Sequence, residues 1–297
     1  MRTAFFEKER EDSIAHDGCV VVDFLDSGEL LKVRQGIGKL GFGVENETKL
    51  RISITQDGVE KRNEIFEELS PVLQSAADKF LQNYKLIRIA IFDKLPGGDG
   101  VRIHQHANLV DESKYRSLAT WLPLTETTVE MGTLYVVKGS HEFSNHVRSY
   151  DDYYRAFNGV SRSLIKRYST PFLLKRGQAI IFDDRLIHWS PPNKSSEIRT
   201  AIQLELVPEE AELAIYYRTN EHELLKYAID RKTYRETALT LERPENLELI
   251  GTLSQPLVSY GNKQFISMMR GIRPGSTKLK EHFFRRLFNG IRRRLGR

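Results

Sequence analysis

The hydrophobic pattern divides the chain into a helical start, a long series of strands and a second helical stretch. A helix is expected to begin at Asp26 or Ser27, which are both capping residue types, and to end near Leu40. A second helix is expected over Arg62–Asn83, where apolar residues recur every three or four positions. After the strands the pattern becomes helical again, most clearly at Glu221–Tyr234.

Short runs with a strand-like pattern fill the middle of the chain, and one more, at Cys19–Val22, precedes the helices. The middle runs are Leu86–Phe92, Val101–His104, Ser117–Leu124, Gly132–Val137, Phe172–Leu174, Ala179–Phe182 and Arg199–Val207. Clusters of Gly, Pro, Asn and Asp separate them, and the loops between them differ in length. This pattern predicts a mainly β protein with flanking helices, folded as an antiparallel sandwich or barrel.

The strand at Arg199–Val207 has two different faces. Its aliphatic face carries Thr200, Ile202, Leu204 and Leu206, and its polar face carries Arg199, Ala201, Gln203 and Glu205. Side chains alternate across a strand, so one face is expected to pack on helices and the other to face a site inside the barrel. An inward guanidinium is costly unless it meets an anion, and its shape fits a carboxylate. The alternative is an edge-strand Arg199 in solvent.

Composition and charge exclude several classes of protein. Apolar residues make up 40% of the 297 residues, which excludes wholesale disorder, and no apolar run reaches the length of a membrane span. The N-terminus lacks the pattern of a secretory signal. The single cysteine, Cys19, excludes an internal disulfide framework and a Cys-rich zinc site, so we expect a cytoplasmic location.

The positive charge is concentrated in the last 22 residues, 276–297. This tail has eight Lys/Arg and one Glu, a net charge of +7, so the remaining 275 residues sum to −2 of the total of +5. The body therefore has no basic signature for nucleic acid. Most of the apolar and basic residues of the tail separate onto two helical faces, a pattern typical of contact with an anionic membrane or an acidic partner. A helix docked on the barrel is the equal alternative.

Three of the eight histidines form a pattern that suits a metal. His104 and His106 lie two positions apart on a strand-like run, which directs both imidazoles to one face. His188 follows 84 residues after His104, just beyond another strand. Two ligands from one strand and a third from a distant strand leave open coordination positions on a metal. Each histidine taken alone is more often an ordinary surface or core residue.

Several motifs with matching order and spacing resemble the phytanoyl-CoA dioxygenase family of Fe(II)/2-oxoglutarate oxygenases. They are IHQHANLVDESKYRSLATWLPL, MGTLYVVKGSHEF and AIIFDDRLIHWSPPNKSSEIRTAIQLELVP, within a resemblance that covers about Asp17 to Glu210. The family has a distal His with an Arg eleven residues later, as His188 and Arg199 are here. The resemblance implies a double-stranded β-helix, or jelly roll, that uses Fe(II), 2-oxoglutarate and O₂.

The resemblance also implies roles for individual residues. His104 and His188 match two iron ligands, and Arg199 and Ser190 match the residues that hold the distal carboxylate of 2-oxoglutarate. Trp121 matches the aromatic residue beside this cosubstrate. Two further matches, Lys49 as another cosubstrate contact and His141 as a structural residue, come from the same comparison.

The chain departs from the family pattern at the metal site, where His106 stands in place of the carboxylate ligand. Two imidazoles, a carboxylate and 2-oxoglutarate give the iron site a formal charge of −1, and His106 in place of the carboxylate changes it to zero. Imidazole binds divalent iron well, so we expect His104, His106 and His188 to share one metal. Asp111 or Glu112 is a less favoured substitute ligand, and the pair is more typical of a loop-stabilising role.

These observations predict a jelly-roll oxygenase domain over residues 1–215 and a helical extension over 216–297 with the basic tail. We expect a dioxygenase that hydroxylates or otherwise oxidises a small organic substrate, with rim insertions such as Glu142–Tyr168 determining its specificity. A three-histidine dioxygenase that works without 2-oxoglutarate is one alternative, and Arg199 and Ser190 argue against it. A catalytically silent jelly roll that acts as a sensor or scaffold is another, and His106 is its main support.

Overall fold

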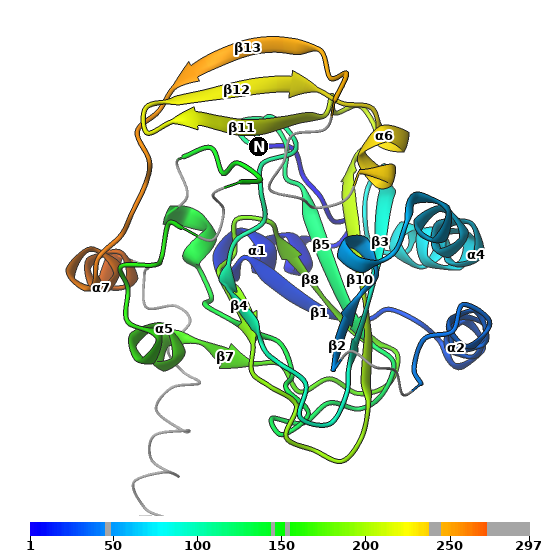
Figure 1. Cartoon of the computed structure of the whole chain (residues 1–297). Helices are drawn as coiled ribbons and strands as arrows, with labels where there is room; N and C mark the ends of the chain where they lie inside the picture. Colours follow the sequence, from blue (N-terminus) through cyan, green and yellow to red (C-terminus); the bar gives the residue numbers. More distant parts are fainter. Residues whose placement is uncertain (45–48, 144–145, 152–154, 238–244, 272–297) are drawn as a thin grey trace, which may run out of the picture.

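Two facing antiparallel β-sheets form the centre of the protein (Figure 1). The computed structural model describes residues 1–44, 49–143, 146–151, 155–237 and 245–271. The larger sheet has the order β1-β8-β5-β10-β3-β2 and the smaller one β4-β9-β6-β7. The bounds of these strands are Cys19–Asp23 (β1), Leu50–Ile52 (β2), Tyr84–Lys94 (β3), Val101–His104 (β4), Leu118–Pro123 (β5), Tyr135–Val136 (β6), Thr170–Pro171 (β7), Gln178–Asp183 (β8), His188–Ser190 (β9) and Arg199–Pro208 (β10).

The eight strands from β3 to β10 wind between the two sheets. β3, β5, β8 and β10 belong to the larger sheet, and β4, β6, β7 and β9 to the smaller one. This exchange is the topology of a double-stranded β-helix, and it confirms the jelly-roll fold expected from the sequence. The winding brings His104 at the end of β4 opposite His188 at the start of β9.

Helices flank both sheets, and those that precede β3 cover the outer face of the larger sheet. Their bounds are Lys8–Asp17 (α1), Ser27–Lys39 (α2), Ser53–Gln56 (α3), Val59–Asp78 (α4), Arg162–Tyr168 (α5), Arg231–Glu236 (α6) and Asn262–Gly271 (α7), with a 3-10 turn at Ser140–Phe143. The predicted cap of α2 is present, because Asp26 and Glu29 each accept the other's backbone N–H. α4 packs on β3, and the apolar stripe of α4 is buried in one core with the outward residues of the sheet.

A second core lies between the two sheets, where inward residues of both meet. The alternation of β10 appears as expected, because Ile202 and Leu204 join the helix-facing core whereas Ala201 joins the inner one. Trp121 of β5 and Phe182 of β8 are also in the inner core. The polar residues Arg199, Gln203 and Glu205 of β10 line an internal cavity, so the predicted inward polar face is confirmed.

The expected helix at Glu221–Tyr234 is wrong over most of its length. Residues 214–254 instead contribute a three-stranded sheet, β11 (Ala214–Asn220), β12 (Glu223–Ala228) and β13 (Leu249–Ser254), which lies across one end of the barrel in Figure 1. The buried residues Leu224 and Tyr227 are three positions apart, a spacing typical of a helix. In the structure β12 pairs with β11 in unbroken register over these residues, so Leu224 and Tyr227 point to opposite faces of the three-stranded sheet and both are buried.

Smaller differences concern lengths and the end of the chain. β6 is shorter than the predicted run at Gly132–Val137, and β7 lies two residues before the predicted Phe172–Leu174. The basic tail at 276–297 lies outside the described residues. Among the residues that the structure describes, no helix has the length and apolar character needed to cross a membrane.

Candidate metal and cosubstrate site

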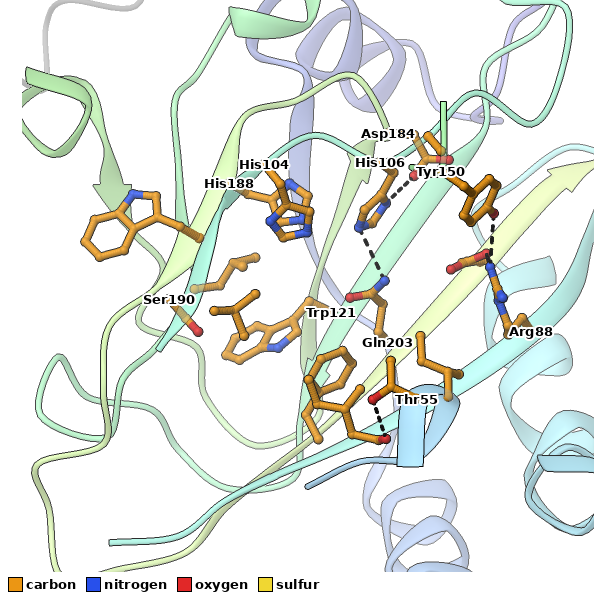
Figure 2. A pocket seen from close by; sticks show the side chains of 18 of the residues that line it. Thr55, Arg88, His104, His106, Trp121, Tyr150, Asp184, His188, Ser190 and Gln203 are labelled. Carbon is orange, nitrogen blue, oxygen red and sulfur yellow. Dashed lines mark hydrogen bonds and ion pairs between the residues drawn. The ribbon is translucent and has the colours of Figure 1, made fainter. Parts of the chain in front are cut away.

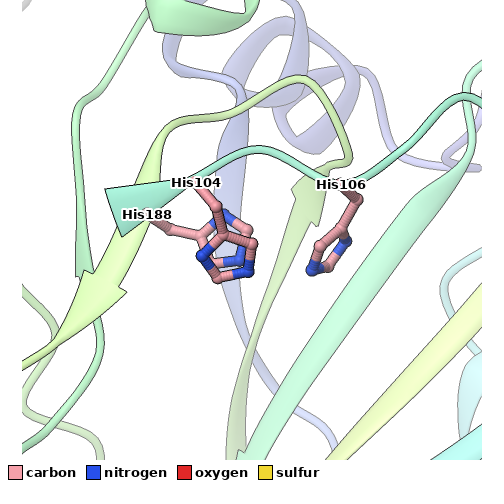
Figure 3. Close-up of side chains that lie close together, drawn as sticks. All are labelled: His104, His106 and His188. Carbon is pink, nitrogen blue, oxygen red and sulfur yellow. The ribbon is translucent and has the colours of Figure 1, made fainter. Parts of the chain in front are cut away.

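The three predicted histidines lie close together (Figure 3) and line the inner cavity. His104 and His188 are paired across β4 and β9, and their ring centroids are 4.1 Å apart. His106 follows β4, and its ring centroid is 4.6 Å from that of His188. One ligand nitrogen from each ring lies within 4.8 Å of the other two. Two ligands of one metal are at most ~4.2 Å apart at bonds of ~2.1 Å, so small side-chain movements complete a shared site.

The hydrogen bonds of the three rings direct their Nε2 atoms toward one another. Nδ1 of His104 lies 2.7 Å from the carbonyl oxygen of Arg102, and Nδ1 of His188 lies 2.8 Å from that of Leu186. A carbonyl only accepts, so both Nδ1 atoms carry the hydrogen. Nδ1 of His106 likewise donates to Oδ1 of Asp184 at 2.8 Å. All three Nε2 atoms therefore keep a lone pair for a metal.

Burial keeps the imidazoles of this site in the form that binds metal. Burial first, and the neighbouring His106 second, lower the pKa of His104 to about 3. The pKa of His188 is also held well below its usual range by burial and by the other two rings. Both imidazoles are neutral at pH 7, and the donor set fits a divalent transition metal.

Arg199 is a buried cation that forms no ion pair with any residue the structure describes. It is 2% exposed, and within the described part of the chain its Nε atom is buried with no hydrogen-bond partner. Burial lowers the pKa of Arg199 to about 10, although the nearby carboxylate of Asp93 acts to raise it. The guanidinium therefore stays charged at pH 7. Its Cζ atom lies 5.5 Å from the ring centroid of Trp121. A charge held in this way fits the carboxylate of a bound ligand.

Lys94 is a site residue that the sequence did not reveal. It lies opposite Arg199 in the β3–β10 pairing and is fully buried. Its Nζ atom donates to Oγ of Ser190 at 2.7 Å and to the carbonyl oxygen of Pro191 at 2.8 Å. Ser190 therefore keeps its own hydroxyl hydrogen for the cavity that it lines. The signal was hidden because Lys94 ends a long apolar strand and its partners come from a segment almost a hundred residues away.

Lys49 is not brought to this cavity. Its side chain is exposed, and its backbone oxygen accepts the N–H of Leu95 at 3.0 Å. It is absent from the described residues that line the cavity, and its role as a cosubstrate contact stays a prediction. His141 is buried and does not belong to the three-histidine cluster. Its Nε2 atom lies 3.1 Å from the carbonyl oxygen of Ala15, in keeping with a structural role.

The acidic pair after β4 does not supply a metal ligand. Asp111 accepts hydrogen bonds from the backbone and hydroxyl of Ser113, and Glu112 forms an ion pair with Arg148. In the described residues the three-histidine cluster includes neither carboxylate. The loop-stabilising interpretation of this pair therefore agrees with the contacts.

The sequence profile of the phytanoyl-CoA dioxygenase (PhyH) family matches residues 17–201, more than half of the chain. The chain belongs to this family. A curated relative, the dioxygenase trt7 of Aspergillus terreus, is 24% identical over 162 residues, which are 50% of this chain and 51% of that protein. This chain thus spans about half the length of that relative in the match.

Solved structures of other proteins are similar to this PhyH family member. EvdO2 from Micromonospora carbonacea, crystallised with 2-oxoglutarate, matches with a TM-score of 0.50 and 18% identity over 68% of this chain and 91% of that one. HygX from Streptomyces hygroscopicus, crystallised with nickel and 2-oxoglutarate, matches with a TM-score of 0.48 and 14% identity over 69% and 88% of the two chains. At this identity the EvdO2 match shows the fold alone.

The family pattern places a carboxylate on the metal. In this chain a carboxylate lies behind the third ligand instead, hydrogen-bonded to His106. Asp184 is 5% exposed, and its side chain accepts the Nδ1–H of His106 while its backbone oxygen accepts the N–H of His106 at 2.8 Å. The negative charge is therefore close to the metal position, although His106 is the side chain directed at it. Asp184 was hidden in the sequence because only the folded turn before β9 brings it to His106.

Proposed function

We propose that this PhyH family member is an iron(II)- and 2-oxoglutarate-dependent dioxygenase that oxidises a small organic substrate with O₂. The observation that carries this proposal is the combination of three neighbouring imidazoles with a buried Arg199 in the same cavity, whose Nε atom has no hydrogen-bond partner among the described residues. A jelly roll that used its metal without 2-oxoglutarate would have no use for this cation. A scaffold without a ligand would keep a costly buried charge for no gain.

Each residue of the site has a defined task under this proposal. His104, His106 and His188 hold the iron, and Arg199 with Ser190 binds the distal carboxylate of 2-oxoglutarate. Trp121 forms a wall beside that cosubstrate. When bound, iron and 2-oxoglutarate would supply the activation of O₂, with one oxygen atom used to convert 2-oxoglutarate to succinate and CO₂ and the other to oxidise a C–H bond of the substrate. Most residues that line the cavity are buried or half-buried, which limits the access of water to this chemistry.

An anaerobic titration tests the proposal directly. Fe(II) and then 2-oxoglutarate are added without oxygen, binding is followed by absorbance, and succinate is measured after exposure to O₂. We expect Arg199→Ala to weaken 2-oxoglutarate binding by roughly tenfold or more and to leave iron affinity almost unchanged. Arg176→Ala, at an exposed position, is the matched control. Equal cosubstrate affinity in all three proteins would reject the assigned role of Arg199.

We also propose a cytoplasmic location and a surface role for the tail. The buried single cysteine, Cys19, suits a reducing compartment. The net charge of +7 on residues 276–297 supports contact with an anionic membrane surface or an acidic partner. Sedimentation with vesicles that contain phosphatidylserine, compared with phosphatidylcholine alone, tests the membrane form. Deletion of 276–297 should abolish the difference in sedimentation between the two kinds of vesicle. A full chain that binds neither kind would contradict membrane contact and favour the acidic partner.

A further inference from the structure

The inner cavity continues past the metal position, away from the cosubstrate end. Along β10 the polar residues that line the cavity are Arg199, then Gln203, then Glu205. The amide nitrogen of Gln203 lies 3.4 Å from Nε2 of His106, so Gln203 marks the level of the metal. A strand rises ~3.3 Å per residue. Glu205 is therefore about 7 Å from Gln203 in one direction along β10, and Arg199 is about 13 Å from Gln203 in the other. The segment near Glu205 is therefore the part of the cavity left for a substrate.

Figure 2 shows the same order in the side chains. Ser190 lies at one end of the cavity, the histidines lie in the middle, and Arg88 and Tyr150 lie at the far end. The cavity encloses about 120 Å³, which is several times the ~10–15 Å³ that one water needs on the same measure. The walls between the ends are largely apolar. They include Ile52, Ile54, Phe92 and Leu134.

At the far end, one oxygen of Glu205 receives all the hydrogen bonds that the described residues make to this carboxylate. Nε and Nη2 of Arg88 lie 3.2 and 3.0 Å from Oε2, and the hydroxyl of Tyr234 donates to the same atom. Tyr150 donates to the hydroxyl of Tyr234 at 2.6 Å, and the guanidinium of Arg88 lies 3.8 Å from the ring centroid of Tyr234. The carboxylate is thus held rigidly from one side.

The other oxygen, Oε1, is available to the cavity. No described residue donates a hydrogen bond to it, and the Glu205 side chain keeps 12% of its surface exposed although Arg88 keeps only 2%. A carboxylate oxygen is an acceptor only, so its natural ligand is a hydrogen-bond donor. Arg88 neutralises the charge of Glu205 at 3.0 Å, so a second cation would gain little from this position. A neutral donor fits better than an ammonium group.

We propose that Oε1 of Glu205 binds a hydroxyl group of the substrate, and that the substrate class is a small, mainly apolar alcohol. The proposal rests on the proposed oxygenase function, because it places the apolar body of the alcohol beside the metal. Glu205 determines specificity by orienting the hydroxyl end. Arg88, Tyr150 and Tyr234 position Glu205 and do not touch the substrate in this assignment.

Intrinsic fluorescence provides a test that does not depend on turnover. The chain has two tryptophans, Trp121 and Trp189, and both line the cavity. The probes are cyclohexanol, which donates and accepts hydrogen bonds, cyclohexanone, which is similar in size and only accepts, and cyclohexylamine, which is cationic at pH 7. Binding is measured in metal-free protein and in protein loaded anaerobically with Fe(II) and 2-oxoglutarate. We expect cyclohexanol to bind about tenfold more tightly than either other probe.

Substitution of Glu205 should reverse this preference. In Glu205→Gln the amide oxygen is expected to turn toward Arg88 and Tyr234, which presents an N–H donor to the cavity and favours cyclohexanone. Glu67→Gln, at an exposed position of α4, is the matched control and should keep the preference for cyclohexanol. Because Glu205→Gln leaves Arg88 buried without its counter-charge, the double variant Arg88→Met/Glu205→Leu is a second test. It should bind the alcohol and the ketone equally.

The outcomes separate this inference from the oxygenase function. Equal binding of cyclohexanol and cyclohexanone by the wild-type protein, or an unchanged alcohol preference in both variants, overturns the role of Glu205. Tighter binding of cyclohexylamine than of cyclohexanol overturns the neutral-donor assignment. Succinate formation on admission of O₂ is recorded in parallel and tests the proposed function alone. Alcohol discrimination without succinate supports the binding site and contradicts the oxygenase.

Discussion

At the scale of single residues, the position of one negative charge distinguishes this metal site. The family pattern places a carboxylate on the metal. Here the imidazole of His106 points to the metal position, and its Nδ1 atom lies 2.8 Å from Oδ1 of Asp184. A carboxylate in this second position fixes the ring, fixes its tautomer and raises the basicity of the ligating nitrogen. The third ligand of the site is therefore a neutral imidazole, and the negative charge lies on Asp184, which is hydrogen-bonded to it.

Removal of this support should weaken metal binding. We expect Asp184→Ala to lower Fe(II) affinity by about 10–100-fold, because His106 loses the acceptor that fixes its tautomer. Asp184→Asn keeps an acceptor without the charge and should have a smaller effect. Competition with a chelating dye measures the affinities, and Asp12→Ala, at an exposed position of α1, is the control. Equal affinities for Asp184→Ala and wild type would show that His106 needs no such partner.

Substitution of His106 itself separates an adapted enzyme from a silent one. His106→Asp restores the charge of the family pattern, but it shortens the side chain and leaves Asp184 beside a new carboxylate. We expect metal to remain bound and the conversion of 2-oxoglutarate to succinate to fall, because the pocket is built around an imidazole. Succinate formation needs no knowledge of the substrate. An active Asp variant beside a wild-type protein that makes no succinate would instead indicate a lineage that lost catalysis.

At the same scale, the sequence predicted some site residues and missed others for a physical reason. His104, His106, His188 and Arg199 follow from strand parity and motif spacing, which are local properties of the chain. The roles of Lys94 and Asp184 depend on which strands pair and on how a turn folds. The spacing of nearby residues in the sequence does not reveal strand pairing or the path of that turn.

At the scale of elements, the pairing of β3 with β10 determines the electrostatics of the cosubstrate end. Lys94 and Arg199 are register partners, and both are buried. The alternation of β10 was predictable because it is a regular strand with one aliphatic face. β12 was not, because it buries Leu224 on one face and Tyr227 on the other, and a spacing of three between buried residues is typical of a helix.

This pairing predicts a pH dependence of cosubstrate binding. Burial first, and Arg199 second, lower the pKa of Lys94 to about 6, so its amine is mostly neutral at pH 7.5. A bound dianion should raise that pKa, since it favours the charged amine. Binding then takes up a proton, and affinity is greatest below about pH 6 and falls as pH rises toward the pKa of the bound state.

The measurement is the dissociation constant of 2-oxoglutarate from pH 6 to 8.5, with Fe(II) present and oxygen absent. We expect a loss of about tenfold over this range in the wild type, and a much flatter profile in Lys94→Met, which keeps the apolar stem and has no titratable group. Lys175→Met, at an exposed position, should follow the wild type. A wild-type profile as flat as that of Lys94→Met would contradict proton uptake by this residue.

At the scale of the whole molecule, the extension and the barrel share a core. Ile215, Tyr227 and Tyr234 are buried in one apolar cluster with Ile87 and Val207 of the barrel. Tyr234 also donates to Glu205, inside the cavity. The predicted division at residue 215 therefore passes through a continuous core, and the three-stranded sheet with α6 closes one end of the barrel (Figure 1).

The shared core predicts that residues 1–215 do not fold stably alone. Tyr217, Leu224, Tyr227 and Tyr234 are at most 7% exposed, and burial of each large apolar side chain contributes about 1.5–3 kcal/mol. Their loss removes about as much free energy as the ~5–15 kcal/mol that stabilises a whole domain. Thermal unfolding followed by circular dichroism should give one transition for the full chain and for 1–271, and none for 1–215. A cooperative 1–215 fragment that melts at the temperature of the full chain would establish an independent oxygenase domain and reject the shared core as a source of its stability.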